Sequence, residues 1–342
     1  MHPSRLRPLR IFLWLLLAGL YLQLAGCAVP GRLSHDEAQS IAGKTFVVTG
    51  ASSGIGRGVA RRLGALRANV VLAARRTALL KEVAAEVATA GGTPLVVTTD
   101  VSKPEDIRRL LNGAIAQFGH IDVWINNAGV GAIGRFEDIP VEDHARIVAV
   151  NVNGVIYGSH AALRLFRSQG SGALVNIGSV ESEIPLAYQA TYAATKAAVL
   201  HLGRALNEEI RLSGSGAISV STVMPFATDT PFFTHMANYT GHTPQMIALD
   251  DPEKVVDAIV WISLHPREEL PVGWKAGGAY VAHHLFPDLS ERASASIYHR
   301  LQMETAPPAP ATSGNLHHPM EAGRAVGGGV RTRLDQERAQ RR

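Results

Sequence analysis

The sequence predicts an α/β fold, in which a doubly wound parallel sheet carries helices on both faces and forms a single domain. Three observations support this prediction. Short runs rich in β-branched residues alternate with helical segments along the middle of the chain. A glycine-rich turn connects the first of these runs to the helical segment that follows it. The chain also has 342 residues, 46% of them hydrophobic, which is enough for one large buried core.

The expected elements follow one another in regular order. We expect strands at residues 44–49, 69–74, 95–99, 121–125, 173–177, 217–224 and near 270–273. Helical segments are expected at residues 57–68, 104–118, from 141 onward, at 251–264 and at 290–303. The folded domain is placed at residues 41–303. Residues 304–342 are predicted to be disordered, because Pro, Gly, Ala, His and Arg dominate there.

The formal net charge of +4 comes from the two ends of the chain. Residues 1–27 and residues 305–342 each carry a net +3, and subtracting both from +4 leaves −2 for the middle. We therefore expect no nucleic-acid partner. Cys27 is the single cysteine, which excludes an internal disulfide. The adjacent histidines at 283–284 and 317–318 are interpreted as solvated, and no metal site is expected.

The N-terminus has the three parts of a secretory signal. Three arginines precede a charge-free run at residues 11–24, and small residues follow it, ending at Cys27. The sequence Leu-Ala-Gly-Cys at residues 24–27 resembles the lipobox of bacterial lipoproteins. This resemblance implies cleavage before Cys27 and lipid attachment to its thiol, so that the protein is held at a membrane. Residues 28–40 are then expected to form a tether.

Two other interpretations of this end stay open. The charge-free stretch from residue 11 to residue 29 has nineteen residues, which is long enough for an uncleaved membrane anchor. The third interpretation is a misassigned start codon. Both membrane interpretations place the folded domain on the non-cytoplasmic side, because the arginines precede the apolar run.

A glycine turn follows the first expected strand and opens the first helix. Its pattern, Thr49-Gly50-x-x-x-Gly54-x-Gly56, places main-chain amides and a helix N-terminus where a pyrophosphate can bind. The alternative is that the glycines only let the helix pack closely on the strand. The spacing resembles that of the short-chain dehydrogenase/reductase family. This resemblance implies that a dinucleotide contacts Gly50, Ser52, Ser53, Gly54, Ile55 and Gly56.

The second expected strand ends at Ala74 and is followed by Arg75 and Arg76. A carboxylate at this strand end would bind the adenosine ribose hydroxyls and repel a 2′-phosphate, whereas guanidinium groups pair well with phosphate. We therefore expect NADP rather than NAD as the cofactor. The alternative is that both arginines simply begin a solvated second helix.

The family resemblance assigns further residues to the cofactor. It implies that Asp100 and Val101, after the third expected strand, contact the adenine. The Asn-Asn-Ala-Gly motif at residues 126–129 is expected to tie adjacent strands first and to line the cofactor second, through Asn127, Ala128 and Gly129.

Near the nicotinamide, the resemblance implies contacts from Pro225 and from Thr230, whose hydroxyl binds the carboxamide. Phe226 stands where the family commonly has glycine, and its side chain is expected to narrow that space. The segment that follows is expected to cover the substrate. Its side chains indicate an apolar ligand, although a packed loop would look the same; they are Phe232, Phe233, Met236 and Tyr239.

The motif Tyr192-x-x-x-Lys196 is the centre of the expected catalytic site. Four residues is just over one helical turn, so a helix would place the phenol and the ammonium on one face. A nearby cation stabilises phenolate and lowers the pKa of tyrosine from about 10 toward neutrality. Tyr192 is then able to exchange a proton with a substrate. The alternative is a half-buried aromatic residue beside a solvated lysine, and Tyr188 is the rival tyrosine.

Ser179 and Asn151 complete the expected catalytic set. Ser179 follows the fifth expected strand, where a hydroxyl can donate to a substrate carbonyl oxygen; a turn serine is the alternative. An asparagine inside a helix is locally unfavourable. Asn151 aligns with the family's asparagine, which disturbs its helix and holds a water that links the lysine to solvent. Asn153 is the rival on sequence alone.

The resemblance covers about residues 44–230 and implies a Rossmann-type sheet with strand order 3-2-1-4-5-6-7. It implies reversible hydride transfer between the nicotinamide and a small-molecule carbonyl or secondary alcohol, with Tyr192 as general acid or base. Lys196 is expected to lower the pKa of Tyr192 and to hold the nicotinamide ribose. Family members often pair through the helices that here hold Asn151 and Tyr192, so we expect a homodimer or homotetramer.

Two other functions are kept as alternatives. One is a membrane-tethered nucleotide-binding protein of the same fold without turnover, because NADPH is scarce outside the cytoplasm. The other is an epimerase of the extended relatives, which share Tyr-x-x-x-Lys but typically carry the wider glycine motif G-x-x-G-x-x-G.

Overall fold

The computed structural model describes residues 33–340 of the chain. The expected signal or anchor, Cys27 included, and residues 28–32 of the expected tether lie outside this part. Within residues 33–340, no helix combines the length and the apolar character that a membrane crossing needs.

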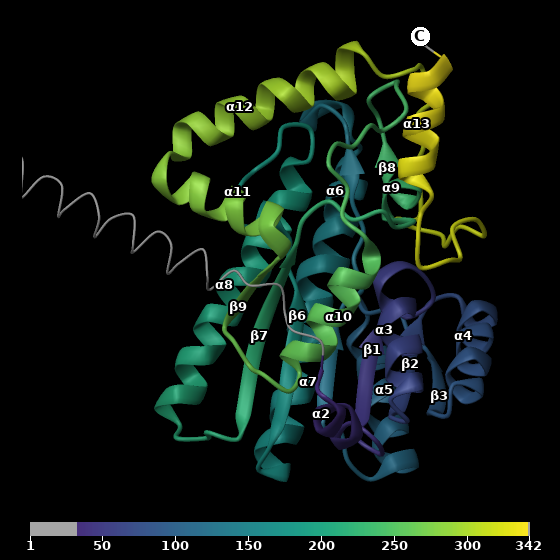
Figure 1. The fold of residues 1–342 in the computed structure, drawn as a ribbon, viewed down its shortest axis with the longest axis vertical. Coiled ribbons are helices and arrows are strands. Elements are labelled where there is room, and N and C mark those ends of the chain that lie inside the picture. Colours follow the sequence, from purple (N-terminus) through teal and green to yellow (C-terminus); the bar gives the residue numbers. More distant parts are fainter. Residues whose placement is uncertain (1–32, 341–342) are drawn as a thin grey trace, which may run out of the picture.

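A parallel sheet of seven strands forms the centre of the molecule (Figure 1). Its strands lie in the order β3-β2-β1-β4-β6-β7-β9, and each neighbouring pair is parallel. The short strands β5 (Ala132–Ile133) and β8 (Ala237–Asn238) pair outside this sheet. Counted without them, the order is the predicted 3-2-1-4-5-6-7. The bounds are β1 (Thr45–Thr49), β2 (Asn69–Ala74), β3 (Thr93–Thr98), β4 (Val123–Asn126), β6 (Gly172–Ile177), β7 (Ile218–Pro225) and β9 (Glu269–Val272).

Helices cover both faces of the sheet, as a doubly wound fold requires. One face packs against α3 (Gly54–Ala65), α4 (Thr77–Thr89) and α10 (Pro252–Ile262). The other face packs against α5 (Pro104–Phe118), α7 (Gly154–Gln169) and α8 (Ala190–Leu212). The pleat of each strand divides its side chains between the two layers, since Phe46 and Val48 belong to the first core and Val47 to the second. Burial on both faces explains why the strands are continuous apolar runs.

The strand order reverses between β1 and β4. From β1 the chain continues to β2 and β3 on one side, whereas β4, β6, β7 and β9 lie on the other. In open α/β sheets a ligand binds in the crevice at such a reversal, outside the carboxyl ends of the strands. The topology therefore places the site at the ends of β1 and β4.

Local sequence explains where individual helices begin and end. α5 begins with Pro104, whose missing N–H is not needed in a first turn, and stops before Gly119, which has a φ of +74°. The expected tether departs from prediction over its last residues, because these form α2 (His35–Ser40). Ser34 and Glu37 close a capping box at the start of α2 and stabilise it.

The C-terminal part of the chain folds over one end of the sheet. Figure 1 shows α11 (Gly273–Leu285) and α12 (Pro287–His299) at the upper end, and the yellow C-terminal segment with α13 (Val330–Gln340) beside α9 (Phe232–His235). Residues 306–329, here called the C-terminal strap, connect α12 to α13. Disorder was expected from residue 304, but the strap and α13 pack against the domain, with Leu316 0% exposed and Val330 1% exposed. A few buried side chains and main-chain hydrogen bonds hold this segment, and composition does not reveal them.

Candidate active site

A cavity of about 390 Å³ opens at the carboxyl ends of the central strands. The turn after β1 and the residues after β4, β6 and β7 form one wall, and residues of α12 and of the strap form the other. Of the residues expected to act in catalysis or to bind the cofactor, Gly56 and Asn151 do not line it. The expected residues that do are Gly50, Ser52, Ser53, Gly54, Ile55, Arg75, Arg76, Asp100, Val101, Asn127, Ala128, Gly129, Ser179, Tyr192, Lys196, Pro225 and Thr230.

The glycine turn between β1 and α3 leaves no space for side chains. Gly50 and Gly54 have φ values of +69° and +57°, which glycine adopts without strain. A Cβ atom on Gly50 would lie 2.9 Å from Ala128 Cα, and a Cβ atom on Gly56 would lie 2.3 Å from Gly50 O. Because Gly56 has no Cβ atom, the first turn of α3 can pack directly against the main chain of Gly50. Gly50 and Gly54 shape a wall to which a ligand can come close, at a helix N-terminus that attracts anions.

Asn126 and Asn127 tie neighbouring strands together. Asn127 Nδ2 donates to Thr49 O at 2.8 Å, and the Asn127 amide donates to Thr49 Oγ1 at 2.9 Å. Asn126 Nδ2 donates to Asn176 Oδ1 at 2.9 Å, between β4 and β6. These contacts agree with the structural role expected first for the Asn-Asn-Ala-Gly motif, and Asn127 also lines the cavity.

Arg75 and Arg76 face the cavity and are held by neutral oxygen atoms. Arg75 Nη2 donates to Asn315 O at 2.6 Å, and Arg75 Nη1 donates to Leu316 O at 3.1 Å. Arg76 Nη2 donates to Ser53 Oγ at 2.6 Å, and Arg76 Nη1 to a strap carbonyl oxygen at 2.9 Å. Neither guanidinium forms a salt bridge with a carboxylate within residues 33–340. Burial lowers the pKa of both guanidinium groups, and the nearby carboxylates of Asp100 and Glu321 oppose this shift without pairing directly with them.

Asp100 and Val101 line the cavity after β3. Asp100 accepts hydrogen bonds from Arg146 Nη2 at 2.8 Å and from Ser102 Oγ at 2.7 Å. Burial alone would raise the pKa of Asp100, but the hydrogen bonds from Ser102 and Arg146 lower it below its ordinary value. A negative Asp100 and a paired Arg146 therefore stand beside Arg75.

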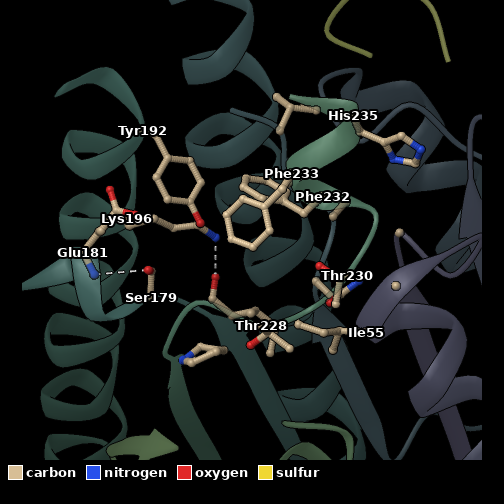
Figure 2. Close-up of a pocket in the computed structure, with 18 of the residues that line it drawn as sticks. Ile55, Ser179, Glu181, Tyr192, Lys196, Thr228, Thr230, Phe232, Phe233 and His235 are labelled. Atoms are coloured by element: carbon tan, nitrogen blue, oxygen red, sulfur yellow. Dashed lines mark hydrogen bonds between the residues drawn. The ribbon is translucent and has the colours of Figure 1, made fainter. Parts of the chain in front are cut away.

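Tyr192, Lys196 and Ser179 meet at the opposite end of the cavity (Figure 2). Tyr192 and Lys196 lie one turn apart on α8, with Lys196 Nζ 5.6 Å from the centre of the Tyr192 ring. Lys196 Nζ donates to Ile177 O at 2.7 Å, which fixes the ammonium against the end of β6. Ser179 follows β6, and it lines the cavity together with Tyr192 and Lys196. The helical turn expected for Tyr-x-x-x-Lys is therefore present, and it faces the cavity.

The electrostatics of this end differ from what the sequence suggested. Burial raises the pKa of Tyr192 above its ordinary value, Glu181 raises it further, and the hydrogen bond with Ser179 opposes both. Burial also lowers the pKa of Lys196 to about 8, and Glu181 opposes that shift. The sequence led us to expect that Lys196 lowers the pKa of Tyr192, whereas burial of the phenol and the nearby Glu181 raise it.

Asn151 lies behind the cavity, in a π-helical turn between α6 (Val141–Val148) and α7. Its side chain is 1% exposed and forms two hydrogen bonds of 2.9 Å with the main chain of Val130. Asn151 Nδ2 also donates to Thr195 Oγ1 at 3.0 Å, next to Lys196. The disturbed helix matches the expectation, and the rival Asn153 takes no part in these contacts. Asn151 therefore connects the loop after β4 to α8 and holds these two segments in place beside the cavity.

The end of β7 and the residues that follow it line one side of the cavity. Phe226 lines the cavity, together with Pro225 and Thr230. Of the four side chains expected to cover the substrate, Phe232 and Phe233 line the cavity, and the Phe232 ring centre is 5.5 Å from that of Tyr192. The other two do not line it. Met236 packs in a core cluster, and Tyr239 donates to a carboxylate of α6.

Sequence reasoning missed several residues of this site. Glu181 lines the cavity near Tyr192 and Lys196, and its Oε2 atom is buried without a hydrogen-bond partner in the part of the chain that the structure describes. Tyr298 of α12 is 6% exposed and accepts a hydrogen bond from Gln189 Nε2 at 2.7 Å. The strap contributes Asn315 and Met320. An acidic residue two positions after Ser179 was a signal that could have been noticed, whereas no local pattern connects Tyr298 or the strap with the cavity.

Comparison with known proteins identifies the class. The sequence profile described as short chain dehydrogenase matches residues 44–239, and the chain belongs to this family. An uncharacterized oxidoreductase, YxnA, of Bacillus subtilis is 34% identical over 277 residues, which cover 80% of this chain and 78% of YxnA. The 3beta-hydroxysteroid dehydrogenase 1 of Eggerthella lenta is 34% identical over 65% of this chain and 87% of its own length.

Solved structures agree with the fold and with a nicotinamide cofactor. An alcohol dehydrogenase of the archaeon Thermococcus sibiricus, complexed with 5-hydroxy-NADP, has a TM-score of 0.57 and 27% identity over 66% of this chain and 94% of its own. A 3-ketoacyl-(acyl-carrier-protein) reductase of Brucella melitensis, complexed with NADH, has a TM-score of 0.58 and 29% identity over 69% of this chain and 93% of its own. The protein described here is an oxidoreductase of the short-chain dehydrogenase family.

Proposed function

We propose that the protein is an NADP(H)-dependent oxidoreductase that interconverts a carbonyl group and a secondary alcohol on a largely apolar substrate. The observation that carries this proposal is the meeting of Ser179, Tyr192 and Lys196 at one end of a single cavity, with Arg75 and Arg76 at the other. The hydroxyl and ammonium groups at the first end can transfer a proton to or from a substrate, and the guanidinium groups at the second end can bind a phosphate.

The residues present fit a dinucleotide. The glycine turn lines the cavity at the N-terminus of α3, where a pyrophosphate binds well, and Gly50 lets the turn pack tightly against Ala128 because it has no Cβ atom. Arg75 and Arg76 would hold the 2′-phosphate, because they are half-buried cations that face the cavity and form no salt bridge with a carboxylate among the described residues. Thr230 and Pro225 would line the nicotinamide. When bound, the cofactor supplies or accepts the hydride.

The protein's own groups control the proton. In the reducing direction Tyr192 would donate its proton to the substrate oxygen while the hydride arrives at the carbon. Ser179 would hold the same oxygen, because it lines the same end of the cavity as Tyr192 and its hydroxyl can donate a hydrogen bond there. Lys196, fixed by Ile177 O, would place a positive charge beside the phenol and support its ionised form in the reverse direction.

The cavity wall favours an apolar substrate body. Phe232, Phe233 and Ile184 line it beside Tyr192, and Met246 and Ile297 line it toward α12. The similarity to a 3beta-hydroxysteroid dehydrogenase supports this choice, since the compounds in that name are apolar secondary alcohols.

Attachment to a membrane through Cys27 is a separate proposal that rests on the lipobox-like sequence alone. Cells that express the full chain should incorporate labelled palmitate into it, and Cys27→Ser should remove the label. Absence of label from the wild-type chain would refute the attachment.

The enzymatic proposal is tested on the purified full chain with a panel of aromatic ketones and their alcohols. Turnover with NADPH should exceed turnover with NADH, and Tyr192→Phe should abolish it while NADPH still binds with nearly unchanged affinity. If the wild-type chain binds NADPH but turns over no compound, the alternative of a nucleotide-binding protein without turnover is favoured. Turnover retained by Tyr192→Phe would refute the role of the tyrosine.

A further inference from the structure

Glu181 is a half-buried acidic residue that the reaction described above does not use. Its Oε2 atom has no hydrogen-bond partner within residues 33–340, although it is shielded from water. A buried polar atom left without a partner costs roughly 1–3 kcal/mol, so such atoms usually have a function. Glu181 lines the same cavity as Tyr192 and Phe232. More of the exposed surface of this cavity is apolar than polar.

The position of Glu181 relates it to the reacting atoms. It lies two residues after Ser179, and its main-chain amide donates to Ser179 Oγ at 3.1 Å. Figure 2 shows its side chain beside Lys196 and Tyr192, at the catalytic end of the cavity. When it is ionised, Glu181 acts electrostatically on both of these groups. A substrate carbonyl held by Ser179 and Tyr192 would therefore place its neighbouring carbon close to the Glu181 carboxyl.

Tyr298 supplies a second polar group from the opposite wall. Its hydroxyl accepts a hydrogen bond from Gln189 Nε2 at 2.7 Å, so its own proton is free to be donated. The Tyr298 hydroxyl donates to Met246 Sδ at 3.5 Å, and a thioether sulfur is only a weak acceptor. Like Glu181, Tyr298 lines the cavity, and its side chain is buried.

We propose that Glu181, assisted by Tyr298, binds a hydroxyl group on the carbon next to the reacting carbonyl, so that the preferred substrates are 2-hydroxyketones and the corresponding vicinal diols with an apolar body. This inference rests on the proposed function. The carboxyl would accept from the substrate hydroxyl, and Tyr298 would donate to it. Burial also raises the pKa of Glu181 to about 8, so the group is largely protonated at neutral pH. A neutral acid suits a hydroxyl, which both donates and accepts, better than it suits an ammonium group.

The test compares two ketones with the same apolar body, acetophenone and 2-hydroxyacetophenone. The full chain should use the hydroxylated ketone with at least a ten-fold higher kcat/KM, because a site built to bind a hydroxyl discriminates against a substrate that lacks it. Glu181→Leu should bring the ratio of the two kcat/KM values close to one. Glu181→Gln, which keeps the size and the hydrogen bonding, should retain most of the preference. Tyr298→Phe should reduce it partially.

The ratio cancels any general effect of these substitutions on proton transfer, because both substrates experience that effect equally. A wild-type ratio near one, or a high ratio that survives Glu181→Leu, would overturn the inference while leaving the proposed function intact. If neither ketone is turned over, the proposed function fails instead. Saturation-transfer NMR on the full chain then decides about Glu181, since 2-hydroxyacetophenone should bind more tightly than acetophenone and lose that advantage in Glu181→Leu.

Discussion

The Nη2 atom of Arg75 donates to the carbonyl oxygen of Asn315 at 2.6 Å, across a separation of 240 residues. The same guanidinium donates to Leu316 O and to His317 O through Nη1. These contacts use both Nη1 hydrogens and one Nη2 hydrogen of Arg75. Two of its five N–H donors, the Nε hydrogen and the second Nη2 hydrogen, take no part in these three contacts. The strap thus holds the guanidinium in one orientation and leaves donors available for a phosphate.

From this arrangement we predict that the strap supports the preference for NADPH. A chain truncated after Thr305 should bind NADPH about ten-fold more weakly, because fixing a free arginine side chain costs roughly 1.5–2 kcal/mol. Its affinity for NADH should change much less. Isothermal titration calorimetry with both cofactors measures the two effects.

The matched control is a chain truncated after Gly329, which keeps the strap and removes α13. It loses buried apolar contacts of Val330 and Leu334, as the longer truncation does, but it retains the carbonyl groups that hold Arg75 and Arg76. The preference for NADPH should survive in this control. If the longer truncation instead binds NADPH more tightly than the full chain, the strap competes with the phosphate and the prediction is wrong.

Arg75 itself should decide between the two cofactors. We predict that Arg75→Ala raises the KM for NADPH by about ten- to a hundred-fold, the loss expected for a hydrogen-bonded charge pair. The KM for NADH should stay within about two-fold. Arg75→Lys should give a KM for NADPH between those of the wild type and Arg75→Ala, because it keeps the charge but loses the planar guanidinium group. Equal effects on both cofactors in steady-state kinetics would refute the phosphate assignment.

The glycine turn gives a prediction about stability and binding together. In Gly56→Ala the new Cβ atom would lie 2.3 Å from Gly50 O, so α3 must move away from the turn. We expect a loss of about 1–3 kcal/mol in the free energy of unfolding and a loss of NADPH binding. Gly113→Ala is the control, since its Cβ atom would meet nothing closer than 3.7 Å and alanine favours a helix. Melting temperatures measured with and without NADPH compare the two variants. Equal melting temperatures, and equal increases on adding NADPH, would contradict the prediction.

The sheet and its helices were predictable because their signals are local. Residues 104–118 were expected as a helix and form α5 with the same bounds, since Pro104 and Gly119 mark its two ends chemically. The Tyr192 and Lys196 pair was readable for the same reason, because a spacing of four residues determines which face of a helix they share.

The remainder of the site depends on contacts between distant parts of the chain. Gln189 meets Tyr298 across 109 residues, and Arg76 meets the carbonyl oxygen of Met320 across 244. A carbonyl group is present in every residue, so no side-chain pattern marks the ones that bind an arginine. The same cause explains the strap, which has a composition typical of disorder and is held by main-chain contacts.

Glu181 also predicts how stability depends on pH. Its carboxyl faces Lys196, Tyr192 and Tyr298, and burial raises its pKa from 4.5 to about 8, with Lys196 opposing that shift. Between these two values the unfolded chain has lost this proton and the folded chain retains it. Stability contributed by the group is therefore complete below pH 4.5 and is lost as the pH rises toward 8. Lys196, with its pKa lowered from 10.5 to about 8, changes stability only above this range.

We therefore predict that the wild-type chain becomes less stable relative to Glu181→Gln as the pH increases from 5 to 8. The amide carries no titrating proton, so the difference between the two melting temperatures should shift steadily in favour of the variant. Glu142→Gln, at an exposed position on α6, is the control and should follow the wild type at every pH. Differential scanning calorimetry at four or five pH values makes the comparison. A difference that stays constant over this range would mean that Glu181 is already ionised in the folded protein, and that it reaches water or a cation instead of lying unpartnered beside the catalytic tyrosine.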